Sequence, residues 1–197
     1  MSGLVSDFFN PYPSIDASTI DAYFYPNHSK NEAQNTKNND VKQPEIAIKT
    51  GYTSKQNTLE IPKLSLSVPI IFSKSAEKSA LMNDLNKGVV FYPGSVYPGQ
   101  VGQMIILGHS APPGWPQIKY DWVFTDINEL KAGDIIFIDL NGKQYKYVVK
   151  KITIIQRGAD VPQDASVSSN NVLTLISCWP PGKDYQRITV TAELVNN

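Results

Sequence analysis

Short apolar runs separated by turn residues dominate the chain from Leu59 onward. Leu64, Leu66, Val68 and Ile70 alternate with polar or proline residues, a pattern typical of a strand with one buried face. We expect further strands at the apolar runs that end in Pro-Gly, Gly-His or similar breakers, namely 89–92, 104–107, 172–178 and 187–194. The pattern therefore predicts a mainly β domain.

A tight hairpin is predicted in the second half of the chain. The pair Asn141-Gly142 separates the apolar runs 135–140 and 144–155. Asn-Gly is a strong hairpin signal because both central residues of the favoured turn adopt positive φ. We therefore expect these two runs to be antiparallel neighbours.

Helical periodicity is limited to two short places. Leu81 and Leu85 lie one helical turn apart, which predicts a helix over 76–87 with Gly88 as its C-terminal cap. A helical turn is predicted at 127–130. About seven or eight short strands with one or two short helices indicate a small closed β-barrel.

The N-terminal part differs in composition from the rest. Residues 1–57 are rich in Asn, Ser, Lys and Pro, which predicts an arm or linker, and residues 58–197 form the expected folded domain. Several aromatic residues near the start are unusual for a pure spacer: Phe8, Phe9, Tyr12, Tyr23, Phe24 and Tyr25. Either the arm docks on the outer face of the domain, or it covers the active-site groove.

Charge and cysteine content exclude several classes of protein. Eighteen basic and eighteen acidic residues cancel, which argues against a nucleic-acid partner because such proteins need surplus positive charge. The single Cys and two His cannot supply the four ligands of a structural zinc site, and we expect no metal and no cofactor. No run approaches the ~20 apolar residues that span a bilayer, and no signal peptide is evident. If the protein works outside the cell, we expect its membrane anchor to lie outside this sequence.

Three residues carry candidate chemistry. Cys178 ends an apolar run just before Trp179-Pro180, and His109 ends another, so both are expected at the rim of the barrel. Arg187 begins a strand nine positions after Cys178 and is one of only two Arg in the chain. Each has a plainer interpretation: a packed thiol, an imidazole bonded to a carbonyl, or a surface salt bridge. Together they describe a nucleophile, an acid/base and a fixed cation.

The motifs around these residues resemble those of the sortase family. The segment 174–178, Thr-Leu-Ile-Ser-Cys, is similar to the sortase signature Thr-Leu-x-Thr-Cys, with Ser177 in place of Thr. The segment 105–110 resembles the histidine strand of the family, and 89–94 its Tyr-Pro-Gly segment. The order His, Cys, Arg also matches. The resemblance covers roughly 59–194 and does not extend to the arm.

The resemblance implies a closed seven- to eight-stranded sortase-type β-barrel and a cysteine transpeptidase. Cys178 would attack an LPxTG-like sorting signal between Thr and Gly and form a thioacyl intermediate. His109 would protonate the leaving amine, and Arg187 would stabilise the oxyanion or hold the substrate backbone. An amine of a cell-wall peptide or a pilin lysine would resolve the intermediate. Such enzymes work at the outer face of the membrane of Gram-positive bacteria.

A largely apolar groove is expected beside these residues. The candidate lining residues are Ser110, Ala111, Pro112, Val161, Thr174, Ile176, Ser177 and Trp179. Trp179 is equally compatible with a core or a rim position. Ser110 either orients His109 or begins the following loop.

Two other functions remain open from the residues alone. One is a cysteine hydrolase on the same barrel; papain-like enzymes place Cys before His, and the Gln-Ala-Cys context of caspases is absent. The other is a noncatalytic peptide-binding barrel. Amine incorporation into a cleaved peptide separates the transpeptidase from the hydrolase.

Overall fold

The protein folds as a β-barrel in a computed structural model that describes residues 51–159, 161 and 171–195. The predicted arm lies almost entirely outside these residues. Its described end forms strand β1 (Gly51–Tyr52), which pairs with the start of β7 (Lys143–Gln156). Within the part of the chain that is described, no helix has the length and apolar character needed to cross a bilayer.

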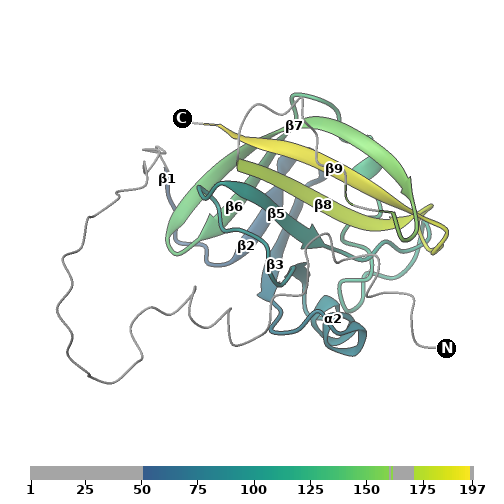
Figure 1. Ribbon diagram of the computed structural model, residues 1–197. Coiled ribbons are helices and arrows are strands. Elements are labelled where there is room, and N and C mark those ends of the chain that lie inside the picture. Colours follow the sequence, from purple (N-terminus) through teal and green to yellow (C-terminus); the bar gives the residue numbers. More distant parts are fainter. Residues whose placement is uncertain (1–50, 160, 162–170, 196–197) are drawn as a thin grey trace, which may run out of the picture.

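Eight strands close the barrel, and β1 adds to its edge (Figure 1). The order around the barrel is β7-β6-β2-β3-β4-β5-β8-β9, and β9 returns to pair with β7. This closure confirms the fold class predicted from the apolar runs. The strands besides β1 and β7 are β2 (Thr58–Ile61), β3 (Leu66–Phe72), β4 (Val89–Phe91), β5 (Gly102–Leu107), β6 (Ile135–Leu140), β8 (Asn171–Trp179) and β9 (Gln186–Val195).

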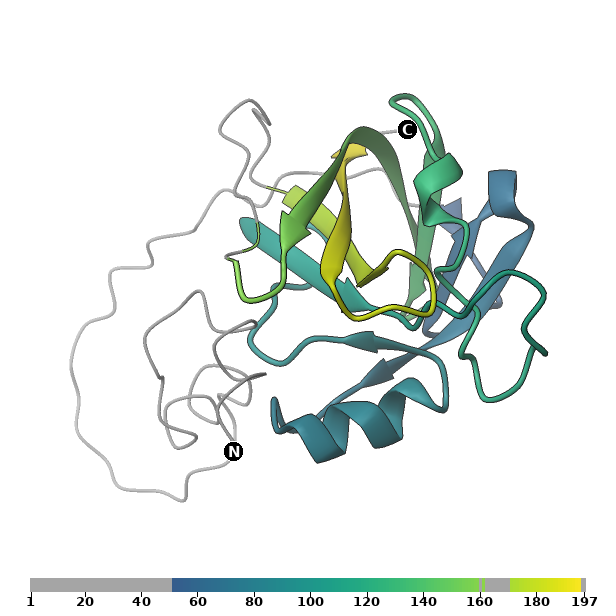
Figure 2. The same ribbon diagram turned by 90° about the vertical axis from the view of Figure 1, so that its right-hand side faces the viewer.

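The apolar residues form two clusters, one on each face of the curved sheet. The inner cluster fills the barrel and includes Leu59, Ile106, Ile138, Leu175 and Val190. The outer cluster joins β4, β5 and β8 to helix α2 (Lys78–Leu85), and consists of Leu81, Leu85, Val90, Tyr92, Ile105, Leu107, Val161 and Ile176. Figure 2 shows α2 outside the barrel, beside β4. Strands that are buried on both faces explain why their apolar runs are continuous rather than alternating.

The predicted Asn-Gly hairpin is confirmed. β6 and β7 are antiparallel neighbours, and the two turn residues Asn141 and Gly142 have φ of 52° and 73°. Two short 3₁₀ turns also occur, at Pro62–Leu64 and Ile127–Glu129, and the second was expected at 127–130.

The prediction that Gly88 caps helix α2 is wrong. The helix ends at Leu85, and Asn86 is its C-cap in a right-handed conformation. Gly88 is required for a different reason: a Cβ at this position would lie 2.3 Å from the carbonyl oxygen of Pro69 in β3. The chain therefore needs Gly where α2 returns to the sheet, because only Gly permits so close an approach between backbones.

Gly88→Ala should destabilise the fold by about 1–3 kcal/mol, because backbone atoms of β3 must move to admit the methyl group. The free energy of unfolding from urea titration measures this effect. Gly51→Ala is the matched control, since the nearest atom to its Cβ would be 3.9 Å away. Equal stability of the two variants would contradict the close-approach explanation.

Candidate active site

One face of the barrel carries the three candidate residues. Leu107 of β5 and Ile176 of β8 are register partners in a parallel pair, and both belong to the outer cluster. Since side chains alternate between the two faces of a strand, Cys178 projects on the same face as Ile176. His109, two residues past Leu107, borders a hollow beside α2 on that face. The outer cluster therefore lies on the same face as the site and next to it.

The hairpin between β8 and β9 places the thiol next to a guanidinium. Cys178 and Arg187 are direct register partners of this antiparallel pair, so their side chains share one face. The Arg187 side chain is largely buried, with 11% of its surface exposed. The sequence-based prediction of a Cys and an Arg side by side at a hairpin mouth is confirmed for their positions.

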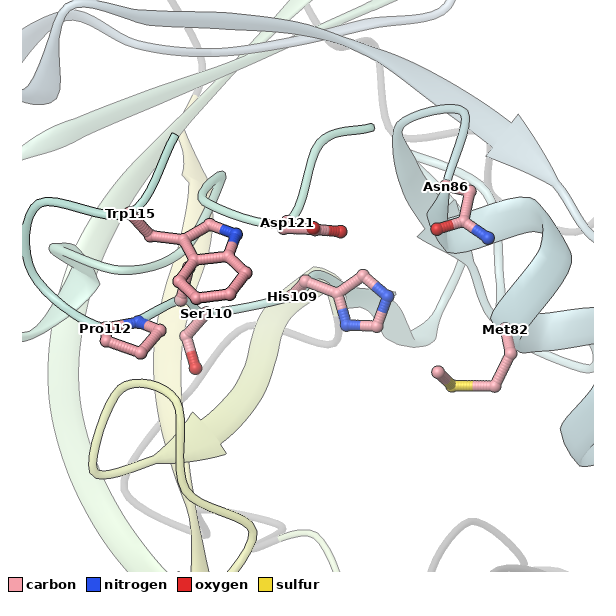
Figure 3. Close-up of a pocket in the computed structure, with 8 residues that line it drawn as sticks. Met82, Asn86, His109, Ser110, Pro112, Trp115 and Asp121 are labelled. Atoms are coloured by element: carbon pink, nitrogen blue, oxygen red, sulfur yellow. The ribbon is translucent and has the colours of Figure 1, made fainter. Parts of the chain in front are cut away.

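His109 opens toward a hollow of about 320 Å³ (Figure 3). Its ring lies between Asp121 and Trp115 on the side of the following loop and Asn86 and Met82 on the side of α2. Burial lowers the pKa of His109, and the nearby Asp121 carboxyl opposes this shift only partly. The imidazole is therefore neutral at neutral pH.

The pKa of the Cys178 thiol is shifted in the opposite direction. Burial raises it, the charge of Arg187 lowers it, and Asp184 raises it again through its charge and a hydrogen bond. The thiol donates to Oδ1 of Asp184 over 3.6 Å. The resting site thus holds a neutral thiol and a neutral imidazole, and the thiolate paired with an imidazolium is a minor form.

Two serine hydroxyls tie the site strands together. Ser177 donates a hydrogen bond of 2.8 Å to the carbonyl of Gly108, the residue before His109. Ser110 donates to the carbonyl of Cys178, also at 2.8 Å. The Ser110 hydroxyl therefore binds the backbone of Cys178. Each hydroxyl links the histidine segment to β8.

Comparison with known proteins identifies the arrangement. Residues 59–195 match the family model described as Sortase domain. The chain belongs to the sortase family. Members of this family are cysteine transpeptidases, which agrees with a partly buried thiol paired in register with an arginine. The matched region contains every residue of the site.

Relatives span several sortase types. The chain is 30% identical over 156 residues to Sortase D of Bacillus subtilis, covering 77% of this chain and 65% of that protein. It is 24% identical over 195 residues to Sortase A of Bacillus anthracis, with coverage of 95% and 85%. The crystal structure of sortase C-1 from Actinomyces oris superposes with a TM-score of 0.56 at 26% identity, over 71% of this chain and 73% of that one. Thus the chain spans about two thirds of the length of the Bacillus subtilis relative.

The other predicted groove residues of this sortase differ in how deeply their side chains are buried. Ile176 and Val161 lie in the outer cluster, and Ala111 is buried at the base of the hollow. Thr174 is fully buried and its hydroxyl accepts a hydrogen bond from Gln103. Trp179 is partly buried and packs against the inner cluster, which agrees with a core role. Pro112 also lines the hollow. Contact of any of them with substrate stays a prediction.

Sequence reasoning missed two charged groups at the sortase site. Asp184, in the loop between β8 and β9, contacts Arg187 through Oδ1 at 2.5 Å and Arg157 through Oδ2 at 3.1 Å. Asp121 flanks His109. Neither aspartate carries a signal in the sequence, because the pairing of Asp184 with both Arg and the position of Asp121 beside His109 depend on the fold.

The alkylation rate of Cys178 by iodoacetamide should reach half its maximum above pH 9. Only the thiolate reacts, and burial raises the thiol pKa from its ordinary value of 9.0. Arg187→Gln should move the profile to still higher pH, because it removes a cation that favours the thiolate. A half-maximum near pH 7 would instead show a stable thiolate–imidazolium pair.

Ser177→Ala should cost about 1–2 kcal/mol of stability, because a buried hydrogen bond to the Gly108 carbonyl is lost. Ser177→Thr retains the hydroxyl and restores the residue of the family signature, so it is the matched control. Urea unfolding of both variants measures the difference. If Thr and Ala destabilised the protein equally, the hydroxyl would not be the cause.

Proposed function

We propose that this protein is a transpeptidase that cleaves an LPxTG-like sorting signal and transfers the acyl fragment to an amine. The observation that carries the proposal is the register pairing of Cys178 with Arg187, next to the segment that bears His109. This arrangement offers a nucleophile, a donor for the developing oxyanion and a proton source on one face. The family of the chain supports the same chemistry.

The proposed reaction begins from the minor ionic form of the site. The Cys178 thiolate attacks the carbonyl carbon of the Thr in the signal, and the carbonyl oxygen takes up the negative charge beside Arg187. The tetrahedral intermediate then collapses as imidazolium His109 gives its proton to the leaving amine. A thioester remains on Cys178. An acceptor amine attacks it and loses a proton to His109, and Cys178 leaves as the thiolate, which restores the ionic form of the site.

The hollow beside His109 suits the amine side of this reaction. It lies next to the acid, so a leaving or entering amine there is within the reach of the imidazole. Asp121 lines it and attracts a positively charged ammonium group, while Trp115 and Met82 offer partly exposed apolar contact. The proposed acceptors are a cell-wall peptide or a pilin lysine. The proposed location is the outer face of the membrane of a Gram-positive bacterium, reached through an anchor.

Incubation with peptides that carry different sorting motifs, with and without a glycine or diaminopimelate-type amine, tests the proposal. Mass spectrometry should find the amine joined to the cleaved peptide, and Cys178→Ala should abolish the product. Cleavage without amine incorporation would favour the hydrolase. No cleavage by the protein, with or without residues 1–50, would favour the peptide-binding barrel. Recovery of cleavage only after deletion would support the hypothesis that the arm covers the groove.

Arg187→Lys should lower kcat/KM by roughly 10²–10³, equivalent to about 3 kcal/mol, because an ammonium group does not reproduce the planar donors of the guanidinium. Steady-state cleavage of the best peptide measures this loss. Lys183→Arg is the control, a conservative basic exchange at an exposed position in the loop between β8 and β9. A loss of less than threefold in the Arg187 variant would exclude it as the oxyanion donor.

A further inference from the structure

The two arginines of the chain meet at one carboxylate beside the nucleophile. Asp184 Oδ1 lies 2.5 Å from Nη1 of Arg187, and its Oδ2 lies 3.1 Å from Nη1 of Arg157. Arg157 directly follows the end of β7, where Ile155 is the register partner of Arg187. Residues from β7, β9 and the loop between β8 and β9 therefore converge on this single side chain.

The same carboxylate oxygen also contacts the thiol. Oδ1 accepts from Cys178 Sγ over 3.6 Å while it is ion-paired with Arg187. A carboxylate at this point has two effects on the reaction. It engages Nη1 of Arg187, which also donates to the carbonyl of Gln186, and so competes with a substrate oxyanion for the guanidinium. Its charge also opposes formation of a thiolate. Both effects hold the site in an unreactive state.

The loop that carries Asp184 is fixed, whereas the side chain is accessible. The amide of Gly182 donates to the carbonyl of Ser110 at 3.2 Å, and a Cβ on Gly182 would lie 2.4 Å from Pro112. The amide of Lys183 donates to the carbonyl of Pro180 at 2.8 Å. Yet 53% of the Asp184 side chain is exposed. The carboxylate can therefore rotate away without movement of its backbone.

We propose that Asp184 is an internal counter-ion that blocks the resting site, and that a bound peptide displaces its carboxylate from Arg187 onto Arg157. This inference rests on the proposed function, because it assigns Arg187 to the reacting carbonyl. Arg157 is the partner that remains after displacement, since its contact uses the other carboxylate oxygen. Its side chain is 37% exposed, so it can follow Asp184 toward solvent.

The charges near Cys178 and His109 determine in which direction loss of the Asp184 charge shifts the thiol pKa. Cys178 is influenced by Arg187 on β9, Asp184 in the adjoining loop and Arg157 after β7. His109 is influenced by Asp121. Removal of the Asp184 charge leaves two cations near the thiol, and its thiolate then forms at lower pH.

The first test measures iodoacetamide alkylation of Cys178 as a function of pH in the full chain. Asp184→Asn should raise the rate at pH 7 by about three- to tenfold, because loss of the neighbouring negative charge lowers the thiol pKa and enlarges the thiolate fraction. Asp184→Glu should keep a profile close to the original. Asp126→Asn is the matched control, because Asp126 is exposed and does not act on either reacting group. A profile of Asp184→Asn that coincides with this control would overturn the proposal.

The second test separates displacement from simple positioning through peptide cleavage. Asp184→Asn should lower KM severalfold, because the peptide no longer competes with the carboxylate for Arg187. Arg157→Gln should raise KM in the original protein but not in the Asp184→Asn background, since Arg157 acts only as the acceptor of the displaced carboxylate. A fall in kcat with unchanged KM and unchanged alkylation would show that Asp184 holds Arg187 in its productive position, and would refute the block.

The alkylation test needs no sorting signal, so the two proposals fail separately. A shifted alkylation profile in a protein that cleaves no peptide would overturn the proposed transpeptidase while supporting the counter-ion. Peptide cleavage with an unshifted alkylation profile would overturn the counter-ion proposal while supporting the transpeptidase. Circular dichroism and thermal unfolding of each variant exclude loss of fold as the cause.

Discussion

The register of β8 between β5 and β9 is the constraint on which the site depends. Parallel pairing of Leu107 with Ile176 and antiparallel pairing of Cys178 with Arg187 place all the reacting groups on the outer face of the barrel. Because side chains alternate with a period of two, a slip by one residue would turn the thiol into the barrel interior and Leu175 out of it. The inner and outer apolar clusters oppose such a slip, since both faces of β8 are packed. The packing that stabilises the barrel therefore also fixes the positions of the site residues.

Burial gives the site its low resting reactivity. It disfavours the charged forms of both Cys178 and His109, so the two pKa values move apart and the ionic pair is scarce. A scarce thiolate limits the rate of nucleophilic attack, but it also protects the thiol from alkylation and oxidation. Arg187 partly compensates for this burial, and Asp184 cancels part of that compensation. Burial therefore has the largest effect on the reactivity of the thiol, and the charges of Arg187, Asp184 and Arg157 adjust it.

The candidate catalytic residues and the charges that act on them come from different parts of the fold. Asp184 and Asp121 lie in the loops that follow β8 and β5. The candidate catalytic residues lie at or next to strand ends, whereas Asp184 and Asp121, which act on them electrostatically, lie in loops.

Contacts between residues close in the chain were predictable from the sequence, and contacts across the barrel were not. The Asn141-Gly142 hairpin and the meeting of Cys178 with Arg187 follow from turn chemistry and a short separation, because a local loop leaves few other arrangements. The parallel pairing of β5 with β8 joins residues about seventy positions apart, and no local pattern encodes it; the family motifs alone suggested that His109 belongs with Cys178. The cap assigned to Gly88 was wrong because the clash that requires Gly there is with Pro69 of another strand. Asp184 was overlooked for a similar reason: its role depends on Arg157, which only closure of the barrel through β7 and β9 brings beside it. Local patterns in the sequence therefore predicted the strands, the turns and the candidate reacting groups. The charges that surround these groups depend on the tertiary structure, because electrostatic interactions depend on distance in space and not along the chain.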